Sequence, residues 1–231
     1  AEGADWSSFR LLLSGGAPIA PSLVERLIRV FGVEYVQTYG MTETSPYLTL
    51  SLLDDHQRRL PEADQIAIRA RTGRPFHRVS LRVVDDQGRP VPADDRTVGE
   101  IQVRGDTVTP GYWNRPAETA AAFTDDGYLR TGDLAVIDQS GSVNIVDRLK
   151  DMILSGGENI YSTEVEHALH AHPAVLEAAV IGVPDERWGE TVLAAVVLYP
   201  GATADADDLV AHCRAHLAAY KAPRHVRFLD R

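Results

Sequence analysis

Cysteine is nearly absent from this sequence: Cys213 is the only one among 231 residues. A single thiol excludes an internal disulfide, so we expect a protein of a reducing, cytoplasmic compartment. Long apolar runs are missing too, because no stretch reaches the roughly 20 residues that a membrane-spanning helix needs. The sequence therefore predicts no membrane span.

Positive charge is also in short supply. The chain has 23 lysines and arginines against 33 aspartates and glutamates, which gives a formal net charge of −10 at pH 7. Nucleic acids and anionic membrane surfaces both require a basic face on their protein partner. The charge balance therefore argues against both partners. The apolar fraction of 44% is ordinary for a globular protein, and the length allows one large domain or two modest ones.

The first 72 residues follow an α/β pattern. Leu11–Ser14 is an apolar run that ends in Gly15-Gly16-Ala17-Pro18, which predicts a buried strand and a tight turn. Pro21 opens an amphipathic helix that Gly32 ends, and Val33–Gln37 follows as a strand. Strand, helix and strand in this order are typical of α/β folds, which bind ligands in loops at the carboxyl ends of their strands.

From Gly73 onward the sequence changes to short alternating segments separated by turn signals. The predicted strands are Ser80–Val84, Gly99–Val103, Leu134–Ile137 and Ser142–Ile145. This spacing predicts a small antiparallel barrel or sandwich. We therefore assign residues 1–147 to one domain, with an α/β segment at 1–72 and a β-barrel subdomain at 73–147.

The pattern changes again after the charged run at residues 147–151. A helix is predicted from Ser162 to His170, with Thr163 and Glu166 spaced as in a capping box. Strands at 174–183 and 191–198 and a helix at 205–217 follow. We expect a compact α+β module at 152–231, connected by a mobile hinge at 148–151.

Several side chains are of the types that hold a nucleotide. Gly15 and Gly16 let a flat ligand approach the backbone closely, and Tyr39 offers an aromatic face. Thr42 can reach a phosphate oxygen, and Glu43 suits Mg²⁺ that ligand phosphates also hold. Each residue alone has an ordinary structural explanation, such as a turn or a packed ring. Their order along the chain is what indicates a nucleotide site.

Three residues further along extend this set. Asp133 could accept hydrogen bonds from both hydroxyls of a ribose, and Arg148 and Lys150 supply positive charge. The run Tyr-Gly-Met-Thr-Glu at 39–43 resembles the YGxTE motif of adenylate-forming enzymes. These include acyl-CoA synthetases, peptide-synthetase adenylation domains and beetle luciferases. The resemblance continues in the family's order through residues 99–101, 111–114, 128–134, 147–151, 155–160 and 220–223.

The resemblance implies roles for individual residues. The ATP- or AMP-binding positions would be Gly16, Ala17, Pro18, Gln37, Thr38, Tyr39, Gly40, Thr42, Asp133 and Arg148. Tyr39 would stack on the adenine, Thr42 would contact the α-phosphate, and Asp133 would hold the ribose. Glu43 would bind Mg²⁺ and share the catalytic role with Thr42, while Lys150 would be the hinge residue. Three positions would border the tunnel for coenzyme A, namely Gly156, Gly157 and Glu158.

The resemblance also implies a reaction. A carboxylate attacks the α-phosphate of ATP and expels pyrophosphate, and the thiol of coenzyme A then attacks the acyl-adenylate. Such a protein positions its reactants and neutralises charge on the phosphorus. The two half-reactions need different groups beside one nucleotide, which the family provides by rotating its C-terminal module.

The sequence departs from the family pattern in two places. Nothing in residues 1–38 matches the family's phosphate loop, and the chain stops at Arg231, before the family's adenylation lysine. Lys221 occupies a different position of the pattern and does not replace that lysine. We therefore expect a fragment that has negligible synthetase activity by itself.

Two functional hypotheses remain open from the sequence. The first is a fragment of an acyl-CoA synthetase, and residues 42–46 and 156–159 most resemble the branch that activates fatty acids. Relatives that load a carrier protein or oxidise a luciferin differ mostly in the acyl pocket. The second is a stand-alone, non-catalytic nucleotide-binding or interaction module. A phosphate loop and a terminal lysine encoded in the flanking DNA would favour the enzyme.

Overall fold

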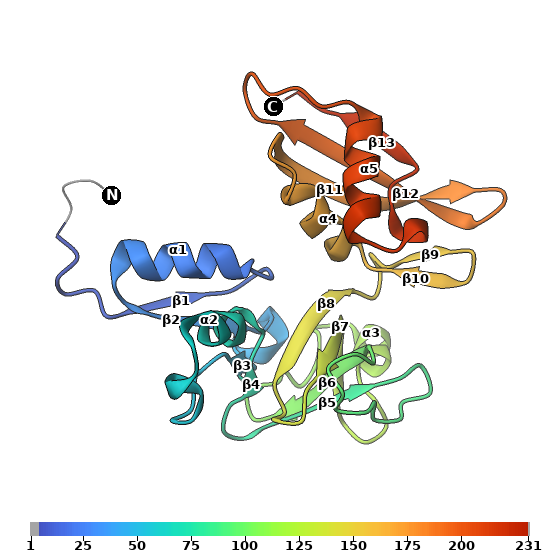
Figure 1. Ribbon diagram of the computed structural model, residues 1–231. Coiled ribbons are helices and arrows are strands. Elements are labelled where there is room, and N and C mark those ends of the chain that lie inside the picture. Colours follow the sequence, from blue (N-terminus) through green and yellow to red (C-terminus); the bar gives the residue numbers. More distant parts are fainter. Residues whose placement is uncertain (1–4, 231) are drawn as a thin grey trace. The chain divides into compact units, whose positions relative to one another are not determined.

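A computed structural model describes residues 5–230 (Figure 1). The chain divides into two compact units, unit 1 at Ala1–Ile145 and unit 2 at Val146–Arg231, and the division lies within strand β8, Val143–Arg148. The hinge expected at 148–151 lies just beyond it, and its mobility stays a prediction. Within the described residues, no helix is both long and apolar enough to cross a membrane.

The first sheet of unit 1 has four strands in the order β1-β2-β3-β4. These are β1 Leu11–Ser14, β2 Glu34–Tyr39, β3 Thr49–Leu50 and β4 Arg74–Pro75. Strands β1 and β2 are parallel, and the remaining pairs are antiparallel. The parallel pair places the ends of β1 and β2 at the same edge of the sheet, which brings the predicted adenine-site segments together.

Helices α1 (Pro21–Phe31) and α2 (Glu62–Ala70) contribute to a small apolar cluster with this sheet. Pro21 suits the first turn of α1, where its missing N–H is not needed, and Gly32 ends the helix with a left-handed φ of 63°. The helix buries Val24 and packs Leu27 and Ile28 at i+3 and i+4, whereas Leu23 is 45% exposed.

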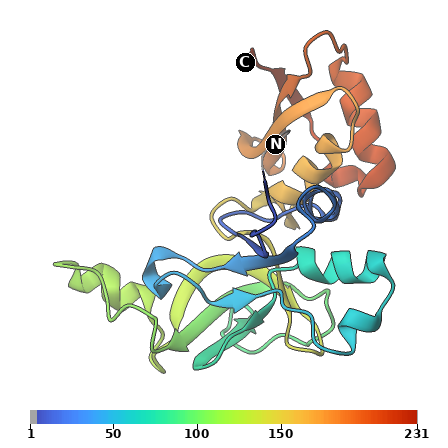
Figure 2. The same ribbon diagram turned by 90° about the vertical axis from the view of Figure 1, so that its left-hand side faces the viewer.

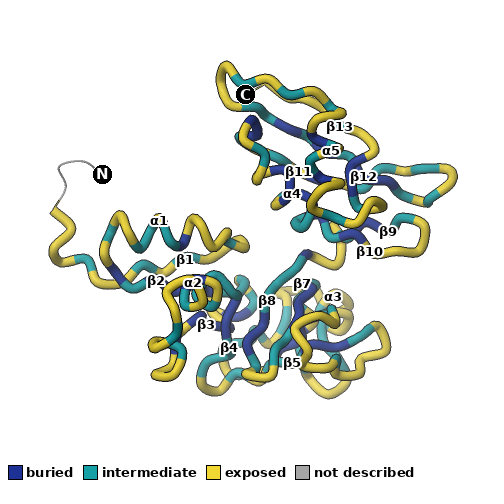
Figure 3. The backbone as a smooth tube through the Cα atoms, viewed as in Figure 1, coloured by how far each residue is buried: buried dark blue, intermediate teal, exposed yellow. Residues whose placement is uncertain are grey.

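The expectation that β1 is a buried strand was wrong. Leu11 and Leu13 are 44% and 48% exposed, and only Leu12 packs into the cluster with α1 (Figure 3). The reason is the period of a strand, which turns alternate side chains to opposite faces. An unbroken apolar run therefore does not show whether one face or both are covered.

The second sheet of unit 1 has four strands in the order β5-β6-β7-β8. Strands β5 (Val79–Val84), β6 (Gly99–Gly105) and β7 (Leu129–Ile137) pair antiparallel. The expected barrel is not confirmed, because the order of the strands is open and β5 and β8 are its two edges within the described residues. Short alternating strands predict a sheet, but its closure depends on pairing between distant strands. Helix α3 (Pro116–Ala122) precedes β7 and was not predicted.

Unit 2 has a five-stranded sheet with two helices. Strands β10, β9, β12 and β11 follow one another in that order, and β13 pairs in parallel with β12. The elements are β9 Ile153–Ser155, β10 Glu158–Ile160, α4 Ser162–His170, β11 Val175–Asp185, β12 Gly189–Leu198, α5 Ala206–His216 and β13 His225–Phe228. Apolar residues of both helices and of the sheet form one core, with Leu169 and Leu209 fully buried.

The capping box expected at the start of α4 was also wrong. Thr163 Oγ1 donates instead to the carbonyl of Val146, and Glu166 Oε1 accepts from the amide of Val180 at 2.9 Å. The buried carboxylate of Asp147 caps the helix, because it accepts from both the amide and the hydroxyl of Ser162. A partner 15 residues upstream has therefore replaced the local cap.

Candidate functional site

The predicted adenine-site segments meet at the ends of β1 and β2. Gln37 Nε2 donates to the carbonyl of Ala17 at 2.8 Å, and Thr38 Oγ1 donates to the carbonyl of Ser14 at 3.0 Å. Gln37 Oε1 accepts in turn from the hydroxyl of Tyr35 at 2.5 Å. Gln37 and Thr38 are both buried, so these bonds hold the turn at 15–18 against β2.

Two glycines allow this close approach. A Cβ on Gly15 would lie 2.4 Å from Thr38 Oγ1, and one on Gly40 would lie 1.7 Å from the carbonyl oxygen of Pro46. Neither position has room for a side chain. Gly16, by contrast, has a φ of +92° and nothing within 4 Å of its ideal Cβ, and Ala17 and Pro18 are exposed. The turn therefore presents an open backbone surface.

Tyr39 and Asp133 connect the two sheets of unit 1. The Tyr39 hydroxyl donates to Asp133 Oδ2 at 2.6 Å, although the two residues are 94 positions apart. Asp133 lies on β7 and is only 7% exposed. Its amide donates to Thr131 Oγ1, and Thr131 Oγ1 donates to the carbonyl of Ile101, so the segment that carries the carboxylate is tied to β6. The structure thus places an aromatic ring beside a nearly buried carboxylate.

Thr42 and Glu43 lie in the short 3-10 helix η1, Thr42–Thr44, which follows β2. Thr42 is exposed and Glu43 is partly exposed. Glu43 Oε1 accepts from the hydroxyl of Tyr112 at 3.0 Å, and this hydrogen bond is the main cause of the raised pKa of the Tyr112 phenol. Tyr112 was missed by the sequence reasoning, because its partner lies 69 positions away.

The charge at Glu43 suits one class of cation. Across the part of the chain that the structure describes, no group of three or more histidine, cysteine, aspartate or glutamate side chains could enclose a metal ion. A single partly exposed carboxylate is what Mg²⁺ needs when substrate phosphates and waters supply its other ligands. The donor set therefore fits a magnesium ion that arrives with a nucleotide and does not fit an all-protein cage.

The predicted residues of unit 2 lie near its first strands. Arg148 ends β8, and Lys150 is exposed in the turn after it. Gly156 and Gly157 form the two-residue turn between β9 and β10, with φ of +62° and +87°, and Glu158 is exposed at the start of β10. Two positive φ angles in a two-residue hairpin are favourable for glycine alone.

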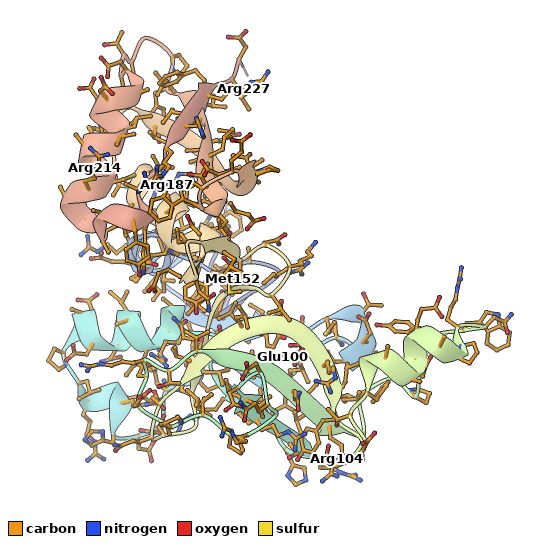
Figure 4. All side chains as sticks on the ribbon, turned by 90° about the vertical axis from the view of Figure 1, so that its right-hand side faces the viewer. Glu100, Arg104, Met152, Arg187, Arg214 and Arg227 are labelled. Atoms are coloured by element: carbon orange, nitrogen blue, oxygen red, sulfur yellow. The ribbon has the colours of Figure 1, made fainter. Side chains whose placement is uncertain are left out.

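Trp188 is a neighbour of this turn that the sequence did not reveal. Its carbonyl accepts from the amide of Gly156 at 2.8 Å, and a Cβ on Gly156 would lie 2.7 Å from its ring. The guanidinium carbons of Arg187 and Arg224 lie 4.7 Å and 5.1 Å from the centre of that ring. Arg187 belongs to the turn that joins β11 and β12, whereas Glu100 and Arg104 lie on β6 (Figure 4). The glycine turn therefore lies beside positive charge.

Fold and site together define a class: α/β proteins that gather an aromatic ring, hydroxyls and carboxylates at the ends of their strands, as nucleotide sites do. The comparisons with known proteins are specific about the family. The model of the AMP-binding enzyme family matches residues 1–113, and that of the AMP-binding enzyme C-terminal domain matches residues 164–231. This chain belongs to the AMP-binding enzyme family.

Named relatives agree with this assignment. The chain is 46% identical to a long-chain-fatty-acid–CoA ligase of Thermus thermophilus over 190 residues, which are 82% of the chain and 35% of that protein. It is also 46% identical to a feruloyl-CoA synthase of an Amycolatopsis species over 228 residues, 99% of the chain and 44% of the relative. The chain thus spans less than half the length of either protein.

A solved structure supports the same conclusion. The crystal structure of ATP-bound MatB from Rhodopseudomonas palustris matches with a TM-score of 0.83 at 37% sequence identity. The match covers 96% of this chain and 42% of that protein. The arrangement of both units therefore belongs to a known adenylate-forming architecture.

Proposed function

We propose that the full-length protein to which this chain belongs is an ATP-dependent acid–CoA ligase. It joins a carboxylic acid to AMP and then transfers the acyl group to the thiol of coenzyme A. The observation that carries this proposal is the set of side-chain hydrogen bonds among residues far apart in sequence, in particular the one from Tyr39 to Asp133. The family membership of the chain supports the same chemistry.

Unit 1 positions the nucleotide in this proposal. The turn at 16–18, with Gln37, Thr38 and Gly40 behind it, borders the adenine, and the ring of Tyr39 stacks on the base. Asp133 accepts hydrogen bonds from the ribose hydroxyls, and the hydroxyl of Tyr39 keeps its carboxylate oriented. The Thr42 hydroxyl contacts the α-phosphate, and Glu43 holds Mg²⁺. When bound, that ion neutralises charge on the phosphates.

The reaction then requires little covalent chemistry from the protein. A carboxylate oxygen of the acid bonds to the α-phosphorus, and the bond between that phosphorus and the oxygen bridging to the β-phosphate breaks, so pyrophosphate leaves. In the second step the thiolate sulfur of coenzyme A bonds to the acyl carbon, and AMP leaves with the electron pair. Thr42 and Glu43 act by orienting the triphosphate for the first step.

Unit 2 serves the second step. Gly156, Gly157 and Glu158 border the pantetheine arm of coenzyme A, and Arg148 reaches the ribose or a phosphate of the nucleotide. The open backbone of the glycine turn supports the first assignment, because nothing lies within 4 Å of an ideal Cβ on Gly157. Lys150 is the hinge about which unit 2 rotates between the two half-reactions.

The acid substrate is the finer part of the proposal. We propose a fatty acid, because the Thermus thermophilus relative is a long-chain-fatty-acid–CoA ligase. The feruloyl-CoA synthase has the same 46% identity, so an aromatic acid is the alternative to compare. Turnover of long-chain fatty acids and of ferulate by the purified full-length protein separates the two, and exclusive use of ferulate would refute the fatty acid.

The experiment that tests the nucleotide site compares Glu43→Gln with Asp133→Asn in the full-length protein. Steady-state kinetics are measured across a Mg²⁺ series, with ATP and with 2′,3′-dideoxy-ATP. Asp86→Asn, in an exposed turn of unit 1, serves as the matched control.

We expect extra Mg²⁺ to relieve the defect of Glu43→Gln, because that variant loses the charge that holds the ion. Asp133→Asn weakens charge-assisted hydrogen bonds, each worth about 1.5–3 kcal/mol, and Mg²⁺ does not restore them. Its defect shrinks with the dideoxy nucleotide, because the wild type loses the same contacts. Magnesium rescue of Asp133→Asn without rescue of Glu43→Gln would show that the two roles are wrongly assigned.

A further inference from the structure

Glu43 is held in place by a loop that has no role in the proposed function. Residues 109–115, here called the clamp loop, run from the end of β6 toward α3. The loop contacts Glu43 twice: the Thr109 amide donates to its carbonyl at 2.7 Å, and the Tyr112 hydroxyl donates to Oε1 at 3.0 Å. Backbone and side chain of one residue are therefore fixed by the same short segment.

The clamp loop is itself fixed to helix α3. The Tyr112 amide donates to Thr119 Oγ1 at 2.9 Å, and the amide of Thr119 donates to the carbonyl of Arg115 at 2.9 Å. Gly111, with a φ of +150°, packs so closely that a Cβ there would lie 2.6 Å from Thr119 Cγ2. In Figure 2, α3 (yellow-green) reaches out from unit 1 on the side where η1 lies. A chain of contacts thus runs from α3 through Tyr112 to Glu43.

We propose that Tyr112 is a positioning residue for Glu43 and that it sets which carboxylate oxygen meets the cation. The Tyr112 hydroxyl engages Oε1, which directs Oε2 to the metal, and one oxygen suits an ion whose other ligands are phosphates and waters. Thr119 supports this geometry from α3. The inference rests on the proposed function of Glu43, and it adds a residue that touches neither substrate nor metal.

A carboxylate that is ordered before the metal arrives binds it more tightly than one that must be ordered on binding. An electronic effect acts in the opposite direction, because a hydroxyl on Oε1 withdraws charge from the carboxylate. The two effects predict opposite results for Tyr112→Phe. Weaker metal binding follows if positioning dominates, and tighter binding follows if the hydroxyl mainly competes with the ion.

The test measures binding and not turnover. Mn²⁺ replaces Mg²⁺ as the probe, and its free concentration is followed by electron paramagnetic resonance in the presence of α,β-methylene-ATP. The full-length protein is compared with Tyr112→Phe, Glu43→Gln and the double variant. Tyr128→Phe is the matched control, because its hydroxyl also makes a single side-chain contact in unit 1, with Ser80 Oγ at 2.8 Å.

We expect Tyr112→Phe to weaken Mn²⁺ binding about 3- to 10-fold, which is the range expected for ordering one side chain. Tyr128→Phe should leave the affinity unchanged. The double variant should bind no more weakly than Glu43→Gln alone, because Tyr112 acts only through Glu43. Thr119→Val should produce a smaller loss than Tyr112→Phe, and Thr119→Ser, which keeps the hydroxyl, should restore the affinity.

Three results would overturn the inference. Unchanged or tighter Mn²⁺ binding by Tyr112→Phe would show that the hydroxyl does not position Glu43. Additive losses in the double variant would show that Tyr112 acts independently of Glu43. A wild-type protein that binds the nucleotide but no Mn²⁺ would refute the metal role of Glu43 in the proposed function, and the role of Tyr112 with it.

Discussion

The candidate residues of unit 1 and those of unit 2 are held in place in different ways. In unit 1 they are fixed by side chains far apart in sequence, as in the hydrogen bonds from Tyr39 to Asp133 and from Tyr112 to Glu43. In unit 2, Gly156 and Gly157 form a local hairpin turn whose shape depends on backbone conformation. A site of the first kind depends on its partners, whereas a site of the second kind depends on its own φ and ψ angles.

The largest effect that tests this comparison comes from adding one methyl group in each unit. In Gly40→Ala the new Cβ meets the carbonyl oxygen of Pro46 at 1.7 Å, so backbone must move, and we expect a loss of about 3 kcal/mol in the free energy of unfolding. In Gly157→Ala the space is open and only the φ of +87° is unfavourable, which costs about 1–2 kcal/mol.

Denaturant unfolding of both variants measures the difference. Gly40→Ala should also alter the environment of Glu43, which is two residues beyond η1's first turn of contacts, and so weaken nucleotide binding. Equal losses in the two variants would mean that the crowding around Gly40 relaxes at little cost, and the distinction between the units would then fail at this position.

A smaller effect is expected from the cap of α4. Asp147→Ala leaves the amide and hydroxyl of the buried Ser162 without their acceptor, which costs about 1–3 kcal/mol. The loss should be confined to unit 2. Hydrogen exchange measures this directly: amides of α4 should exchange faster, while those of β6 keep their wild-type rates. Asp151→Ala, at an exposed position, is the control, and equal acceleration in both units would contradict a local cap.

The smallest effect concerns pH. His212 packs on the rings of His172 and His216, with centroids 5.1 Å and 4.3 Å away, and burial together with these neighbours lowers its pKa. The unfolded chain therefore binds a proton more readily than unit 2 does. The stability from this group is fully present above the unfolded pKa of about 6.5 and is lost as the pH falls below it through the lower folded value.

Unit 1 should not share this response. Its most shifted acid is Asp126, whose pKa Arg82 lowers to about 2, so the stability of that pair is lost only in the range from about 4 down to about 2. Amide exchange at pH 7.5 and pH 5.5 should thus show α5 destabilised and β6 unchanged. A His212→Gln variant should remove the difference in α5, and a response in β6 of equal size would contradict the assignment.

The sequence predicts local features of this fold well. The bounds of β1, α1 and α4 and the types of the candidate residues follow from apolar spacing and from glycine and proline signals. The errors lie where distant partners decide the outcome. Asp147 replaces the expected local cap of α4, and the open order of β5 to β8 replaces the expected barrel.

The candidate site shows the same division. The types of Tyr39 and Asp133 could be recognised from the sequence, but not their hydrogen bond across 94 positions. Tyr112 and Trp188 have no signal of their own, because each matters through a contact: Tyr112 with Glu43, and Trp188 with Gly156. A pattern in one sequence indicates chemistry, whereas these positions require three-dimensional contacts.

The most direct test of the proposed reaction is the identity of its products. The full-length protein is mixed with Mg²⁺, ATP and a carboxylic acid, quenched, and analysed by mass spectrometry with and without coenzyme A. We predict acyl-AMP and pyrophosphate without coenzyme A, and acyl-CoA with AMP when it is present. Formation of ADP and phosphate, or binding of ATP with no acyl-AMP across a broad panel of acids, would contradict the account.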